Sequence, residues 1–134
     1  MPEQTKKILL AEDDEFLSSL IKNRLERENY SVTLVVDGSQ IIEAMKREKP
    51  QLMLLDLILP NKLGFEVLEE AKADPEIDKI PVMVISNLGQ PEDIKKTQEL
   101  GAIDYFIKAQ ILIDDLIKRI AVFFEKGKEG YQPE

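Results

Sequence analysis

The chain has 134 residues, of which 43% are hydrophobic, and this size and composition suit one compact domain with a buried core. It contains no cysteine and no histidine, which excludes disulfides, zinc sites, thiol nucleophiles and imidazole catalysis, and leaves oxygen ligands for a hard cation such as Mg2+. The net charge of -8 opposes direct binding to nucleic acid, and the lack of a signal-peptide or membrane-length apolar run predicts a cytoplasmic protein with no membrane association.

Short apolar runs alternate with amphipathic stretches along the chain. The apolar runs predict strands at residues 8–11, 32–36, 52–55, 82–85 and 103–107. Helical spacing predicts five helices, whose apolar faces are formed by Phe16, Leu17, Leu20, Ile21 and Leu25; Ile41, Ile42 and Met45; Val67, Leu68 and Ala71; apolar positions from Ile94 to Leu100; and Ile113, Leu116, Ile117, Ile120 and Phe124. Residues 1–126 are therefore expected to form the domain, and residues 127–134 a flexible C-terminal tail.

The fourth of these helices has the weakest apolar stripe, although Pro91 and Gly101 mark its two ends. We expect it to be the least rigid part of the domain.

The alternation of strands and helices predicts an α/β fold. The strands are too apolar to have one wet face, which indicates a parallel sheet covered by helices on both sides. With right-handed crossovers, a doubly wound five-stranded sheet is the default arrangement. Ligands of such sheets bind beyond the carboxyl ends of the strands, where the winding direction reverses.

Polar side chains follow four of the five strands at those carboxyl ends. They are Glu12, Asp13 and Asp14 after the first strand, Asp56 after the third, Ser86 after the fourth and Lys108 after the fifth. Asp56 is the most informative, because it lies within the apolar run QLMLLDLILP, where an ionised carboxylate is costly without a cation or hydrogen bonds to compensate it. Clustered acids repel one another, so the group itself indicates a bound cation.

These side chains are the parts that phosphoryl transfer needs. Asp56 can act as the nucleophile, the acids can hold a divalent metal, and the lysine and the hydroxyl can contact the phosphoryl oxygens. Each residue alone also has an ordinary structural interpretation: the acids from Glu12 to Glu15 can complement a helix dipole, Ser86 can cap a helix or lie in a loop, and Lys108 can lie on the surface. Their joint placement at strand ends favours the functional interpretation.

Four segments carry a family resemblance along nearly the whole chain, from about Lys7 to Glu125. ILLAEDDE, LLDLILPNKLGFEVLE, PVMVISN and GAIDYFIKA, in this order, resemble the receiver domain of two-component response regulators. The resemblance implies a flavodoxin-like sheet with strand order 2-1-3-4-5. The chemotaxis receiver is a known example of a doubly wound fold with this strand order.

The resemblance also implies the roles of the acids. Asp56 would accept a phosphoryl group from a sensor histidine kinase or a phosphotransfer protein. Asp13 and Asp56 would ligate Mg2+ directly together with the backbone carbonyl of Ile58, and Glu12 would act through water. Asp14 then occupies a position that is not a ligand. Such a protein is a signalling phosphoacceptor, and its only catalysis is Mg2+-dependent phosphorylation and dephosphorylation of itself.

The remaining implied roles concern the response to phosphorylation. Lys108 resembles the lysine that contacts the phosphate, Ser86 the switch hydroxyl, Tyr105 the switch aromatic residue, and Gly64 the glycine of the loop after the acceptor. A downstream effector is expected to bind the face made by the fourth helix, the fifth strand and the fifth helix, and a homodimer is a further possibility for this face.

The chain departs from the family pattern at three places. Ala109 follows Lys108 where a cis proline is usual, and because a cis bond before a residue other than proline costs about 2.5–4 kcal/mol, this bond is expected to be trans. Asn87 replaces the small residue usual beside the switch hydroxyl, and the run from Asn61 to Gly64 lacks the acid common before that glycine.

Three other interpretations share part of this pattern. A haloacid-dehalogenase type of enzyme needs a second acid two residues after the nucleophile, where this chain has Ile58. An FMN carrier needs a phosphate loop after the first strand, where the acids from Glu12 to Glu15 would repel an anion. A receiver used as an interaction module without phosphorylation is the remaining alternative.

Overall fold

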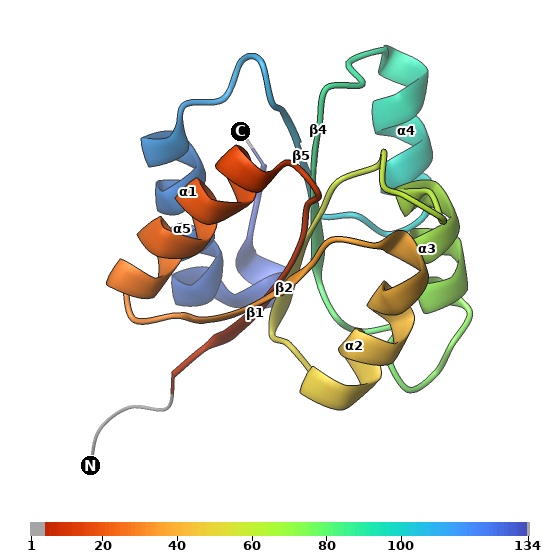
Figure 1. Cartoon of the computed structure of the whole chain (residues 1–134), viewed down its shortest axis with the longest axis horizontal. Helices are drawn as coiled ribbons and strands as arrows, with labels where there is room; N and C mark the ends of the chain where they lie inside the picture. Colours follow the sequence, from red (N-terminus) through yellow and green to blue (C-terminus); the bar gives the residue numbers. More distant parts are fainter. Residues whose placement is uncertain (1–4, 134) are drawn as a thin grey trace.

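The structure is a computed structural model that describes residues 5–133, and it is a five-stranded sheet flanked by helices (Figure 1). In chain order its elements are β1 (Lys7–Ala11), α1 (Glu15–Arg27), β2 (Ser31–Val35), a short 3-10 turn η1 (Gly38–Gln40), α2 (Ile41–Glu48), β3 (Leu52–Leu55), α3 (Gly64–Lys72), β4 (Val82–Ser86), α4 (Pro91–Glu99), β5 (Asp104–Ile107) and α5 (Ile113–Gly130). No helix within residues 5–133 is long and apolar enough to cross a membrane.

The predicted topology is confirmed. The strands are all parallel and lie in the order β2-β1-β3-β4-β5, so the winding direction reverses between β1 and β3. α1 and α5 cover one face of the sheet, and α2, α3 and α4 cover the other (Figure 1). Leu52 and Leu54 of β3 belong to the core under α1 and α5, whereas Met53 and Leu55 belong to the core under α2 and α3.

The burial of β3 positions the residue that follows it. All four of its side chains are inaccessible to solvent, and burying a side chain of this size stabilises the fold by about 1.5–3 kcal/mol. A shift of one residue in this strand would exchange the side chains between two differently shaped cores. The register of β3 is therefore strongly determined, and it places Asp56 directly beyond the carboxyl end of the central strand.

Two aromatic residues differ from the predicted helix faces. Phe16 was expected on the buried face of the first helix, but its side chain is 81% exposed, while Ile21 and Leu25 are buried as predicted. Phe16 is the second residue of α1, which begins shortly after the carboxyl end of β1. In α5 the fully packed aromatic is Phe123, and Phe124 is only partly buried, with its ring against Tyr30.

The C-terminal segment also differs from its prediction. The helix continues to Gly130 with a kink at Gly127, and Tyr131 is buried in the core under α5. The Tyr131 hydroxyl donates to Asp104 and accepts from Arg119 Nε at 3.1 Å, and Arg119 also pairs with Asp104. Sequence periodicity did not predict the packing of Tyr131, because this residue follows a break in the helix.

The fourth helix matches its prediction. Pro91 is in its first turn, Gly101 follows its end with a positive φ of 95°, and Thr97 is its only buried residue. Because so little of α4 is buried, this helix needs less free energy to shift than α5, which buries four residues.

Candidate functional site

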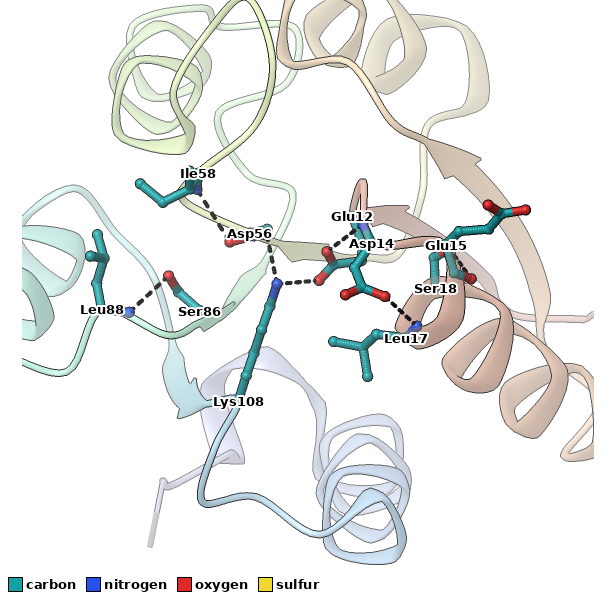
Figure 2. Close-up of polar contacts among 10 residues, drawn as sticks. All are labelled: Glu12, Asp14, Glu15, Leu17, Ser18, Asp56, Ile58, Ser86, Leu88 and Lys108. Carbon is teal, nitrogen blue, oxygen red and sulfur yellow. Dashed lines mark hydrogen bonds and ion pairs between the residues drawn. The ribbon is translucent and has the colours of Figure 1, made fainter.

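The carboxyl edge of the sheet brings the predicted polar residues together. Glu12 follows β1, Asp56 follows β3, and Lys108 reaches across from the end of β5 to both of them (Figure 2). The Lys108 ammonium lies 2.7 Å from Asp56 Oδ2 and 2.8 Å from Glu12 Oε1. The predicted convergence of these three side chains is therefore present, although they are up to 96 positions apart in the sequence (108 minus 12).

This ion-paired group is almost entirely removed from solvent. Glu12 is 0% and Asp56 3% exposed, and the second Glu12 oxygen accepts the backbone N–H of Asp14 at 3.0 Å. Burial raises the pKa of Glu12, and the Asp56 charge adds to the rise, while hydrogen bonds from Lys108 and Asp14 oppose it. Burial alone would lower the pKa of Lys108, but the hydrogen bonds and charges of Asp56 and Glu12 raise it above its usual value.

A third acid completes the cluster. Asp13 is exposed, and it offers a carboxylate oxygen that lies with oxygens of Glu12 and Asp56 in a group spanning no more than 4.8 Å. Opposite ligand oxygens of a Mg2+ ion at about 2.1 Å each would lie about 4.2 Å apart, so a small closing movement suffices. The three carboxylates carry more negative charge than the single ammonium of Lys108 can balance, and the oxygen-only donor set suits a hard divalent cation.

Asp14, predicted not to be a ligand, has a structural role. Its side chain accepts the backbone N–H of Leu17 at 2.8 Å and so caps the first turn of α1. It lies outside the group of acids that could share a metal. Asp14 therefore serves the start of a helix, as acids after a strand often do. Glu12 does not, because its side chain pairs with Lys108.

The loop after Asp56 turns sharply around the side chain of this residue. The Ile58 N–H donates to Asp56 Oδ1 at 3.2 Å, and the Gly64 N–H donates to the Leu57 carbonyl at 2.8 Å. A Cβ atom at Gly64 would lie 2.5 Å from the Asp56 carbonyl oxygen, so only glycine allows α3 to begin this close to Asp56. The structure thus explains why a glycine is needed at this position.

Ser86 and Tyr105 are both connected to the same residue of the β4–α4 loop. The buried Ser86 Oγ accepts the N–H of Leu88 at 3.2 Å (Figure 2), and the Tyr105 hydroxyl donates to the carbonyl of Leu88. Burial raises the pKa of Tyr105, so this phenol stays protonated and able to donate. A movement of Leu88 would therefore affect both side chains.

The departures from the family pattern leave the site intact. None of the described peptide bonds is cis, so the bond between Lys108 and Ala109 is trans as predicted, and Lys108 still reaches both acids. Asn87 is exposed beside the buried Ser86.

Sequence reasoning missed a contact that supports the loop after Asp56. Asn61 Nδ2 donates to Asp37 Oδ2 at 2.6 Å, and the N–H of Gly38 donates to the Pro60 carbonyl at 2.9 Å. Asp37 and Gly38 follow β2, and such Asp-Gly and Pro-Asn pairs are turn signals. The signals mark two separate turns, but they do not predict that the turns bind each other.

Comparison with known proteins agrees with this arrangement. Residues 8–121 match the family described as response regulator receiver domain. Response regulator RR06 of Streptococcus pneumoniae is 35% identical over 119 residues, which cover 89% of this chain and 53% of that protein. The chain spans about half the length of the curated relatives it matches.

Solved structures with the same fold agree as well. The phosphorylated cyanobacterial phytochrome response regulator RcpA superposes with a TM-score of 0.79 at 32% identity, covering 91% of this chain and 95% of that one. The Mn2+-bound form of response regulator Rcp1 has a TM-score of 0.75 at 32% identity, covering 88% of this chain and 91% of that one.

Proposed function

Because this chain belongs to the family of response regulator receiver domains, a family of signalling proteins in two-component systems, we propose that it is a switch activated by phosphorylation of Asp56. The observation that carries the proposal is the Lys108 ammonium, which is 2.7 Å from Asp56 and 2.8 Å from Glu12 beside the carboxylate of Asp13. A buried carboxylate held next to one cation and two acids suits a nucleophile for phosphoryl transfer better than a structural ion pair.

The chain's own residues would carry out the transfer. An Asp56 carboxylate oxygen would form a bond to phosphorus while the bond to the donor's leaving group breaks, and the Lys108 ammonium would face the oxygens of the transferred group. Asp13, Asp56 and the Ile58 carbonyl would hold Mg2+ directly, and Glu12 through water. The metal, when bound, supplies positive charge that neutralises the phosphoryl oxygens.

A protein donor suits the surface around the site. Phe16 and Leu112 are 81% and 67% exposed, and Val36, Ile58 and Leu63 are also exposed large apolar residues. All five lie in segments at or just beyond the carboxyl ends of the strands. An apolar rim around a charged centre is typical of a surface that binds another protein, which supports a histidine kinase or phosphotransfer protein as the donor.

The double attachment of Leu88 suggests how the signal would spread. If the Ser86 hydroxyl turned toward a phosphate on Asp56, it would release the N–H of Leu88, and the carbonyl held by Tyr105 would move with that residue. α4, with one buried residue, is the helix that such a pull would displace. Effectors, or a second copy of the chain, would then recognise the face of α4, β5 and α5.

Incubation with acetyl phosphate and Mg2+ tests the proposed reaction. We expect the intact mass to rise by one phosphoryl group, and removal of the metal by EDTA to prevent the gain. The phosphoryl group should map to Asp56 after reduction of the acyl phosphate. A protein that stays unmodified under these conditions would instead support the interaction module that needs no phosphorylation.

Substituting Ser86 by Ala should separate phosphorylation from the switch. The variant should still take up phosphate, because Ser86 is neither nucleophile nor metal ligand, but the phosphorylation-dependent changes in amide NMR shifts of residues 87–108 should shrink several-fold. The measurement is a pair of 1H–15N spectra with and without acetyl phosphate. Shift changes equal to those of the wild type would contradict the coupling through Leu88.

A further inference from the structure

We propose that Asp37 and Asn61 are positioning residues that hold the loop of residues 57–63 in place and thereby set the Mg2+ affinity of the site. The inference rests on the proposed function, because it concerns the loop that carries Ile58, whose carbonyl is a proposed ligand. Neither Asp37 nor Asn61 belongs to the group of acids that could hold the metal.

Two turns from different parts of the fold meet at this place. Asn61 Nδ2 donates to Asp37 Oδ2 at 2.6 Å, and the Gly38 N–H donates to the Pro60 carbonyl at 2.9 Å. The backbones approach so closely that a Cβ atom on Gly38 would lie 1.9 Å from the Lys62 carbonyl oxygen. The turn after β2 therefore contacts the loop through hydrogen bonds and direct backbone packing.

The Asp37 carboxylate is itself held in one orientation. Its Oδ1 accepts the backbone N–H of Ser39 at 2.8 Å and the Ser39 hydroxyl at 2.7 Å, which leaves Oδ2 facing Asn61. A carboxylate fixed in this way can hold the amide of Asn61 without losing further rotational freedom. The contact is thus preorganised from the β2 side.

Asn61 lies in an unusual backbone conformation. Its φ is 68°, in the left-handed region, which an L-residue adopts only at some cost unless its surroundings determine it. Asparagine tolerates this region better than most residues, and its side-chain bond to Asp37 holds it there. Without that bond the loop loses one of the contacts that determine its path.

Hydrogen bonds hold the loop on both sides of Ile58 and at Ile58 itself. Toward the acceptor, the Ile58 N–H donates to Asp56 Oδ1 at 3.2 Å, and at the far end the Gly64 N–H donates to the Leu57 carbonyl at 2.8 Å. The turn after β2 holds the middle of the loop, through the side-chain bond from Asn61 to Asp37 and the backbone bond from Gly38 to Pro60. A metal site pays for loop ordering when the metal binds, so a loop that is already ordered binds more tightly.

The effect should come from the hydrogen bond rather than from the charge of Asp37. Asp37 is partly exposed to solvent, where salt screens its field, and Asp56 and Glu12 already dominate the potential of the site. The expected change in Mg2+ affinity therefore comes from the position of the loop and not from the charge of Asp37.

A double-mutant cycle on Mg2+ affinity tests this inference in the full chain. The variants are Asp37→Ala, Asn61→Gly and the double variant. Glycine adopts the positive φ without strain and removes the side chain. Each single variant should bind Mg2+ about tenfold more weakly, as is usual when an outer contact of a metal site is lost, and the double variant should lose no more than either single one. The dissociation constants are measured by isothermal titration calorimetry at one ionic strength.

A second readout does not depend on the metal. Hydrogen exchange of the Ile58 and Lys62 amides, measured by NMR in EDTA, should be faster in both single variants and unchanged in the core strands. Glu43→Ala, which removes an exposed acid from the neighbouring helix α2, is the control for lost charge and should match the wild type in both measurements.

The outcomes separate this inference from the proposed function. Mg2+ affinities in both single variants equal to the wild type, or losses that add in the double variant, would overturn the positioning role alone. A wild type that does not bind Mg2+ at all would contradict the proposed function, and this inference would fall with it.

Discussion

Asp56→Asn is expected to abolish phosphate uptake from acetyl phosphate and, at the same time, to make the protein more stable by about 1–2 kcal/mol at neutral pH without Mg2+. The loss of uptake follows because an amide cannot replace the carboxylate nucleophile. The gain in stability follows because two buried carboxylates, Glu12 and Asp56, share one ammonium in the wild type. Asparagine keeps the size of the side chain and an oxygen for the Ile58 N–H, and removes one of the two charges.

The stability gain should depend on pH in a defined direction. The folded-state pKa of Glu12 is raised, chiefly by burial, above its usual value of 4.5. A group with a raised folded pKa contributes stability that is present below its unfolded pKa and lost as pH rises through the folded one. The charge of Asp56 adds to this rise in the pKa of Glu12, and its repulsion of Glu12 is lost once Glu12 binds a proton. The stability advantage of Asp56→Asn should therefore shrink as the pH falls toward about 4.5.

Urea denaturation at pH 7.5 and pH 5 measures this prediction, and the intact mass after acetyl phosphate treatment measures the loss of uptake. Asp78→Asn, at an exposed acid outside the site, is the matched control and should change neither. A variant less stable than the wild type at both pH values would mean that the pair of Asp56 and Lys108 contributes more than the repulsion between the acids removes.

Lys108→Met should have the opposite effect on stability, a loss of about 3–5 kcal/mol at neutral pH without Mg2+. Methionine keeps the length of the side chain and loses the ammonium that lies within 2.8 Å of both buried acids. Glu12 is 0% and Asp56 3% exposed, so water cannot replace the lost cation. Two uncompensated charges in the interior are among the few single-site changes that cost this much.

Two additions should restore part of the lost stability. Mg2+ should stabilise Lys108→Met more than the wild type, because the metal would then be the only cation beside the acids. Acid should help as well, because loss of Lys108 removes a hydrogen bond that lowers the pKa of Glu12, so that pKa rises further. By the same sign argument, the deficit relative to the wild type should decrease as the pH falls toward 4.5, because folded Glu12, with its raised pKa, binds a proton above that value.

The control for this prediction is Lys95→Met, which removes an exposed lysine of α4 and should change the free energy of unfolding by no more than about 0.5 kcal/mol. Equal unfolding free energies for Lys108→Met and the wild type, with no extra response to Mg2+, would contradict the view that this ammonium compensates the acids. A phosphorylation assay on the same variant should show a large loss of uptake, since Lys108 faces the transferred group.

Most of the fold could be predicted because its causes are local. Runs such as Leu52–Leu55 show in the sequence as uninterrupted apolar segments, and the parallel arrangement follows from their alternation with helices. The predictions that failed concerned which face of a helix is buried and where a helix ends. Phe123 and Phe124 are neighbours on a helix, so a small rotation decides which one is buried, and Tyr131 packs only after the kink at Gly127.

The residues of the site could be predicted where they follow strands, because the carboxyl ends of parallel strands lie at one edge of the sheet. Asp56, Glu12 and Lys108 could be placed together because each directly follows a strand of one parallel sheet. The support of that site could not be predicted in the same way. Nothing in the turn after β2 indicates that Asp37 holds Asn61, since either turn would form alone.

The sequence by itself determined which segments become strands and helices, and it also placed an acid at the end of the central strand, because apolar periodicity and strand ends are properties of neighbouring residues. Only the tertiary structure decided that one ammonium would serve both Glu12 and Asp56, that Leu88 would connect Ser86 with Tyr105, and that Tyr131 would enter the core. These contacts depend on distances of a few ångströms between segments far apart in the chain, and packing of the whole domain sets those distances.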